Sequence, residues 1–169
     1  HLGRIIKLCH KKKAERPESE WKYKGRVVFE GNHVHDQSGM QALFSEQGTG
    51  ASHQTSSKWL DLLARLPGND GADCDAQSAY TQAQLEGEDT WEELPAEARP
   101  KAWSGYIRPV CKLRLALYGH PLAGLYWESH CKQALVKCGF TPVPSWECMY
   151  QHKENNVTVS NTHLTLPTK

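Results

Sequence analysis

The sequence contains no long hydrophobic run and no paired cysteine motif. No segment approaches the roughly 18 consecutive apolar residues that a membrane-spanning helix requires, and none has the basic, apolar and small-residue order of a signal peptide. The six cysteines include no Cys-x-x-Cys pair, and a chain of 169 residues can bury a core without disulfides. We therefore expect a soluble intracellular protein with reduced thiols and no membrane partner.

Charge of each sign is scarce where the other is concentrated. Residues 1–26 hold nine Lys or Arg against three Glu, a net charge of +6. Residues 67–100 hold nine Asp or Glu against Arg99 alone. This asymmetry is compatible with a basic surface for a polyanion beside an acidic metal-binding region. A solvated basic tail is the open alternative.

The first regular element is expected at residue 21. Residues 1–19 are polar and rich in Lys, so we expect residues 1–20 to form a polar basic lead-in that is flexible or partly ordered. Residues 21–31 are rich in aromatic and β-branched residues and stop at Gly31, as a strand would. Because side chains alternate along a strand, Lys22, Lys24 and Arg26 should share one face. Three cations there favour a phosphate ligand, and an edge strand protected by its charge is the alternative.

The rest of the chain mixes helical and strand patterns. Apolar residues at helical spacing predict two helices, while β-branched and aromatic runs between turn residues predict strands and a hairpin. In chain order we expect a helix capped by Ser56 or Ser57 and ended by Pro67-Gly68, a strand ending at Asp75, an edge strand over residues 106–113 with Pro109, a helix ended by Gly139, and a hairpin of residues 148–151 and 157–160. This order predicts an α+β fold.

Asp75 is the candidate centre of chemistry. A carboxylate at the exit of a strand, followed by small residues and then the ring of Tyr80, would lie on the floor of a cleft with an aromatic wall. That geometry suits metal-assisted phosphoryl transfer, in which carboxylates hold divalent cations roughly 3.5–4 Å apart. The alternative is a solvated Asp75 followed by a tyrosine of the core.

Four groups of residues resemble motifs of one family, in the family's order. Residues 22–28 are similar to Lys-x-Arg-Leu-Val, and residues 75–87 to Asp-Val-Lys-x-Ala-Phe-Leu-x-Gly-x-Leu. Residues 113–127 are similar to Leu-x-x-x-Leu-Tyr-Gly-Leu-Lys-Gln-Ala-Pro-Arg-x-Trp, with His120, Pro121 and Leu122 departing from it. Residues 137–140 and 146–150 echo the Gly-Phe and Asp-x-Cys-x-Phe pieces. Together, residues 21–160 resemble the reverse transcriptase domain of copia-type retrotransposon polyproteins.

The resemblance implies a fold, a reaction and partners. The fold would be the partial fingers and palm of an RNA-directed DNA polymerase, which acts by a two-metal mechanism with Mg²⁺ or Mn²⁺. The partners would be an RNA template, a DNA primer and deoxynucleoside triphosphates, with integrase and RNase H domains in the parent polyprotein. The implied roles are a first metal-binding and catalytic carboxylate at Asp75, a ring beneath the sugar at Tyr80, triphosphate contacts at Lys24 and Arg26, and a nucleotide pocket shaped by Tyr118 and Gly119.

The end of the chain departs most from the family. There, the strand after the hairpin continues into Tyr-Val-Asp-Asp, whose aspartates complete the metal site. Here residues 161–169 resemble a translated sequencing adapter, and no Asp follows Asp89. We therefore expect a non-native tail over residues 161–169, a fragment over residues 21–160, and no catalysis by this chain alone.

Two other functions stay open. A catalytically dead domain retained for binding nucleic acid or a protein partner fits the basic N-terminal region and the missing aspartate pair. A small zinc-binding module is the third hypothesis, because thiol and imidazole side chains gather in the C-terminal third. The candidate ligands are His130, Cys131, Cys138, Cys148 and His152. Cysteines on the apolar face of a helix are more often small hydrophobic residues of the core.

Overall fold

The structure is a computed structural model that describes residues 1–44 and 54–160. Within these ranges the chain forms two sheets and two α-helices, which confirms the α+β fold class. The sheets have the strand orders β2-β1-β3-β4 and β5-β6-β7. The expected tail over residues 161–169 lies outside the described residues. The bounds are β1 (Leu2–Lys12), β2 (Lys22–Phe29), α1 (Gln54–Ala64), β3 (Trp91–Glu93), β4 (Val110–Lys112), α2 (Ala123–Lys137), β5 (Thr141–Pro142), β6 (Met149–His152) and β7 (Val157–Ser160).

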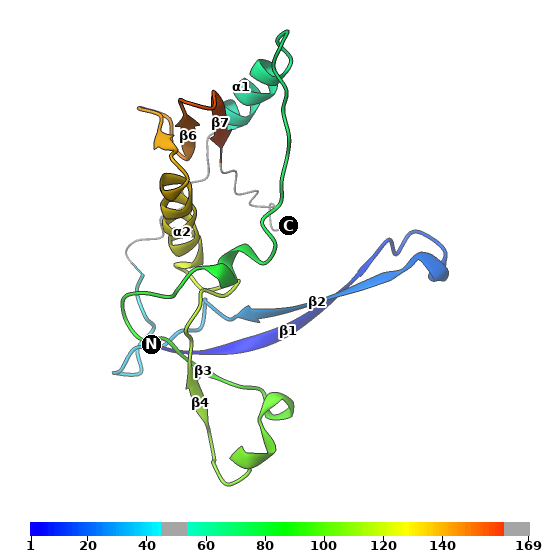
Figure 1. The fold of residues 1–169 in the computed structure, drawn as a ribbon. Helices are drawn as coiled ribbons and strands as arrows, with labels where there is room; N and C mark the ends of the chain where they lie inside the picture. The colour runs from blue at the N-terminus through cyan, green and yellow to red at the C-terminus, as the bar shows by residue number, and fades with distance from the viewer. Residues whose placement is uncertain (45–53, 161–169) are drawn as a thin grey trace.

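The most prominent feature is a long two-stranded ribbon that projects from the rest of the molecule (Figure 1). It is made by antiparallel pairing of β1 with β2, from Ile5 opposite Phe29 to Lys12 opposite Lys22. We call these paired residues, 5–12 and 22–29, the arm. Residues 1–20, expected to be a flexible or partly ordered lead-in, instead contain Leu2–Lys12, the longest strand described. Its β-branched and apolar residues can enter a ladder once β2 supplies the partner.

The base of the arm joins the arm to the rest of the first sheet. There β1 pairs in parallel with β3, and β3 pairs antiparallel with β4. β4 follows Pro109 and lies at the edge of the sheet, as expected for a strand next to a residue that lacks a backbone donor. The main hydrophobic core forms beside this base around Phe29, Val34 and Ala42.

The two helices match their expected positions with one correction. α2 ends at Lys137, just before Gly139, which has the positive φ of a helix terminator. α1 begins at Gln54, so Ser56 is a buried residue within the helix and neither Ser56 nor Ser57 is its cap. Serine costs an α-helix only about 0.5 kcal/mol relative to alanine, too little to fix the first turn at that residue.

The expected hairpin is confirmed as β6 and β7, which pair antiparallel with β5 on the other side of β6. α1 lies beside this second sheet (Figure 1). All six cysteines are free thiols, as expected. No helix within the described ranges combines the length and the apolar character needed to cross a bilayer.

The strand expected to end at Asp75 does not form. Residues 69–76 have no regular secondary structure and are exposed, and the backbone then turns through Ser78, whose φ is +52°. This segment is dominated by Asn, Asp and Gly, which are depleted from strands, and it has no β-branched residue to pack on a sheet. Asp75 is therefore held on an exposed connection, outside both sheets.

Candidate functional site

A row of cations follows one face of the arm. Directly paired residues on neighbouring strands point to the same face, so β1 adds Lys12 and His10 to the β2 cations Lys22, Lys24 and Arg26. The Lys and Arg side chains in this row are exposed, and none forms an ion pair with a described residue. The prediction that the β2 cations share a face is confirmed by the register. His10 and Lys12 were missed because β1 was not expected to be a strand.

The opposite face at the tip of the arm carries an aromatic ring. Lys11 Nζ lies 3.4 Å from the centroid of the Trp21 ring, a cation–π contact. Trp21 Nε1 donates a hydrogen bond of 2.8 Å to the carbonyl oxygen of Arg16, and Arg16 pairs with Glu20 at 3.0 Å. Cations at the tip are therefore divided between two faces, and those facing Trp21 are already partnered.

The inner end of β2 meets the segment that contains Tyr118 and Gly119. Phe29 N donates a hydrogen bond of 2.7 Å to the Tyr118 carbonyl oxygen. Gly119 has a φ of +88°, and a Cβ there would lie 2.1 Å from the Phe29 carbonyl oxygen. A Cβ on Gly31 would likewise lie 2.1 Å from the Gly119 carbonyl oxygen. The two backbones therefore touch at a distance that only glycine permits.

Tyr80 packs against Tyr118, next to the contact between Gly119 and Phe29. Its ring centroid lies 4.6 Å from that of Tyr118, with the ring planes at 59°. Tyr80 packs on a second core cluster of Ala83, Ala116 and Ala123. Burial, and then the neighbouring Tyr118 hydroxyl, raise the pKa of Tyr80, so its phenol stays neutral. We call Phe29, Tyr80, Tyr118 and Gly119 the junction; it brings two of the sequence motifs together with the residue directly after a third.

Asp75 lies on its exposed connection, five residues before Tyr80 in the sequence. Its neighbour Cys74 is close enough to Cys131 of α2 to contribute to the raised pKa of that thiol, and Cys131 in turn acts on Cys148 beside β6. The Asp75 segment therefore runs past α2 on the side of the second sheet. Asp75 itself has no hydrogen bond or ion pair with a described residue.

The residues around Asp75 do not fit a two-metal site. Such a site needs several oxygen ligands converging on each cation. Across residues 1–44 and 54–160, no group of three or more His, Cys, Asp or Glu side chains is arranged to hold a metal ion. The described residues thus supply one candidate ligand for Mg²⁺ or Mn²⁺, and no catalytic step can be derived from them.

The zinc hypothesis fails the same test. All five of its candidate ligands lie within the described ranges, and no three of them converge. Burial raises the pKa of the Cys148 thiol to about 11, which disfavours the thiolate that binds zinc. His152 is instead packed edge-on against Phe140, with ring centroids 5.2 Å apart.

His120, which departs from the family motif, is a buried residue to which the sequence assigned no role. It is 5% exposed, and its ring lies 5.2 Å from that of Phe29. Leu122 N donates a hydrogen bond of 3.2 Å to His120 Nδ1, which leaves Nε2 to carry the proton toward Thr90 Oγ1 at 3.4 Å. Burial lowers the pKa of His120 from the ordinary 6.5 to about 4, so the imidazole is neutral.

We expect this neutral imidazole to make the fold sensitive to acid. The unfolded chain binds a proton at His120 near pH 6.5, whereas the folded chain binds it only near pH 4. Stability should therefore fall as the pH drops between these values, by on the order of 2 kcal/mol from this residue. Urea unfolding at about pH 7 and about pH 4.5 measures the loss. His120→Gln should show a smaller loss, and an equal loss in both chains would contradict the assignment.

Comparisons with other proteins assign no family: no family model matches the chain, and neither the curated proteins nor the solved structures give a match.

Proposed function

We propose that the chain is part of the RNA-directed DNA polymerase domain of a copia-type retrotransposon polyprotein. In this proposal the arm binds the phosphates of nucleic acid or of an incoming nucleotide, with Lys24 and Arg26 as the central contacts. Tyr80, Tyr118 and Gly119 form the adjoining pocket wall, and Asp75 is the first carboxylate of the catalytic metal site.

One observation carries the proposal beyond the order of the motifs. Two motifs meet at the junction, where Tyr118 packs on Tyr80, and the residue directly after a third motif joins them, because Phe29 N bonds to the Tyr118 carbonyl oxygen. The cations of β2 lead directly to this point, since Arg26 is three residues from Phe29 on the same strand. Cations placed where charge develops on a phosphoryl group stabilise its transfer, which is why their position near the junction supports a polymerase pocket.

The described residues support binding more than catalysis. Asp75 is exposed and has no neighbouring carboxylates that would complete a metal site among the described residues. A second candidate function, nucleic-acid binding by a catalytically dead domain, is favoured by this observation. Both candidates predict that the arm binds nucleic acid. They differ only in whether DNA synthesis appears when a strand containing Tyr-Val-Asp-Asp is added after β7.

Binding by the arm can be tested directly. Charge-driven binding of a strand weakens steeply with salt, with a slope near 0.7 per phosphate contact. We expect Lys24→Gln with Arg26→Gln to weaken binding of a fluorescein-labelled oligonucleotide about tenfold and to lower the salt slope by about 1.4. Fluorescence anisotropy between low and moderate salt measures both quantities.

The matched control removes two exposed cations elsewhere. Lys132→Gln with Lys137→Gln, on α2, changes the net charge equally but leaves the arm intact. Equal weakening by the two double variants would show that binding follows net charge alone, and the arm would then not be the site.

A further inference from the structure

Three arginines surround one carboxylate at the base of the arm. Arg99 Nη2 lies 3.1 Å from Glu93 Oε1, and Arg108 Nη2 lies 2.8 Å from Glu93 Oε2. Arg4 of β1 is directly paired with Glu93 of β3, so the two side chains share a face of the sheet. We call Arg4, Glu93, Arg99 and Arg108 the base cluster.

The base cluster has more positive charge than its carboxylate can neutralise. Glu93 is only 15% exposed, and the pKa of its carboxyl is held low by Arg108 first, with further contributions from Arg4 and Arg99. The other nearby acids have partners of their own. Glu92 accepts a hydrogen bond of 3.4 Å from Cys111 Sγ. Glu30, whose backbone N bonds to the Arg4 carbonyl oxygen, lies 3.0 Å from His33 Nδ1, and Glu97 is paired with Lys7 at 3.2 Å. The Arg108 side chain remains 62% exposed and Arg4 is exposed, so both can meet a further anion.

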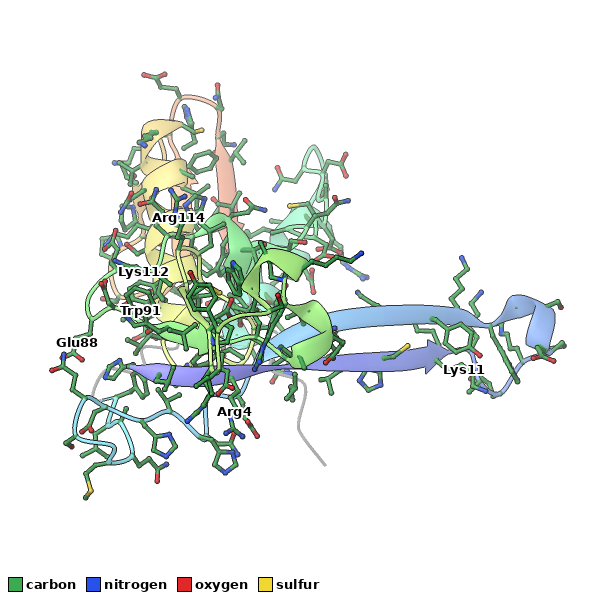
Figure 2. The ribbon with its side chains drawn as sticks, turned by 90° about the horizontal axis from the view of Figure 1, so that it is seen from below. Arg4, Lys11, Glu88, Trp91, Lys112 and Arg114 are labelled. Carbon is green, nitrogen blue, oxygen red and sulfur yellow. The ribbon has the colours of Figure 1, made fainter. Side chains whose placement is uncertain are left out.

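The base cluster lies on the same face as the cations of the arm. Side chains alternate along β1, so Arg4, Ile6, Leu8, His10 and Lys12 all project from one face. Figure 2 shows Arg4 where β1 passes the body, with the arm running on toward Lys11. One face therefore carries cations at both ends, with the exposed side chains of Ile6 and Leu8 between them.

The length of the whole row of cations sets the size of the ligand. Arg4 and Lys12 are eight residues apart on one strand, which corresponds to roughly 26 Å at about 3.3 Å per residue. Arg26 lies between them, because it is paired with Leu8. A single nucleotide cannot contact the whole row, whereas a nucleic-acid strand of several nucleotides can. The apolar side chains of Ile6 and Leu8 can contact the unpaired bases of a single strand. In a duplex the bases are paired, and the outer surface consists of phosphates, which do not bind apolar side chains.

We propose that Arg4 and Arg108 form a second phosphate-binding site, and that one single strand of nucleic acid spans this site and the arm. This inference rests on the proposed function of the arm and extends it. Arg99 holds Glu93 in place, while Arg4 and Arg108 contact the backbone of the strand. The side chains of Ile6 and Leu8 contact the bases of the strand.

The test uses the full chain and a fluorescein-labelled 20-nucleotide oligothymidine. Arg4→Gln with Arg108→Gln should weaken binding about tenfold and lower the salt slope by about 1.4, as expected for two lost phosphate contacts on a single strand. Arg4→Lys with Arg108→Lys should retain most of the affinity, because the charge is kept. Glu93→Gln should tighten binding severalfold, because it frees the arginines from their carboxylate, a gain that loss of structure would not produce. Lys132→Gln with Lys137→Gln is the control for net charge.

The outcomes separate this inference from the proposed function. If the base-cluster variant binds like the α2 control while Lys24→Gln with Arg26→Gln still binds weakly, the second site is wrong and the arm stands. If the arm variant binds like the control, the proposed function fails and this inference fails with it. Tighter binding of a duplex of the same length than of the single strand would overturn the choice of ligand.

Discussion

Replacing Gly119 with alanine is expected to lower the free energy of unfolding by about 3 kcal/mol. The added methyl group would lie 2.1 Å from the Phe29 carbonyl oxygen and 2.6 Å from Val28 Cγ1. The backbone φ of +88° is also unfavourable for any residue with a Cβ. Since the nearest atom belongs to the backbone of β2, relief requires the end of β2 to move, which separates Phe29 from Tyr118.

Gly105→Ala is the matched control. A Cβ at Gly105 would have no heavy atom within 4 Å, so this variant should stay within about 0.5 kcal/mol of the original chain. For a chain of this size, 3 kcal/mol corresponds to a fall in Tm of about 6–12 °C. Thermal unfolding followed by circular dichroism gives the comparison. Equal melting temperatures for the two variants would mean that β2 and the Gly119 segment do not touch as described.

The contact between Gly119 and Phe29 explains why position 119 requires glycine, independently of any ligand. The sequence assigned Tyr118 and Gly119 to a nucleotide pocket by resemblance, whereas the structure shows Gly119 as the point where two backbones cross. The two roles are compatible, because a close crossing at Gly119 also fixes where the Tyr118 ring packs against Tyr80. In Gly119→Ala, the loss of stability would therefore be the direct effect, and any loss of binding would follow from it.

Local patterns predicted the elements that local interactions define. α2 has apolar residues at helical spacing and a terminating Gly139, and the β6–β7 hairpin has two strand-like runs around a polar turn. β4 could be placed at a sheet edge because Pro109 lacks a backbone donor. Each of these signals is contained within a few residues, so no knowledge of distant partners was required.

The errors arose where the outcome depends on distant partners. β1 carries many lysines and is stable as a strand because β2 and β3 pair with it on its two sides. The Asp75 segment was expected to end a strand at a cleft, yet its residues favour an exposed connection. Strand pairing explains why β1 forms a strand, and amino-acid composition explains why the Asp75 segment does not.

The part of the candidate site that lies on one strand was predictable, and the part that depends on pairing between strands was not. Alternation along one strand gave the shared face of Lys22, Lys24 and Arg26, and the register confirms it. The contributions of His10, Lys12 and the base cluster come from pairing between strands that no sequence pattern specified. The apolar residues among the basic residues of β1, including the β-branched pair Ile5-Ile6, were the available signal.

DNA synthesis is expected from a longer chain and not from this one. We expect a chain in which residues 161–169 are replaced by a strand containing Tyr-Val-Asp-Asp to extend a DNA primer on an RNA template, with Mg²⁺ or Mn²⁺ present. The reason is that the described residues provide one candidate carboxylate, and the resemblance places the others directly after β7. Primer extension by the 169-residue chain itself would show that the metal site has been put in the wrong place.

In the extended chain, Asp75→Asn should reduce synthesis by about a thousandfold, because metal-assisted charge stabilisation contributes several kcal/mol to such reactions. The change removes charge and little volume from an exposed residue, so the melting temperature should not move. Asp73→Asn is the control, since Asp73 lies on the same exposed connection two residues away. Tyr80→Ala should retain synthesis and admit ribonucleotides, because it removes the ring expected beneath the sugar. Equal activity of the Asp73 and Asp75 variants would show that Asp75 is not a ligand of the catalytic metals. No synthesis by the extended chain itself would favour the catalytically dead nucleic-acid-binding domain.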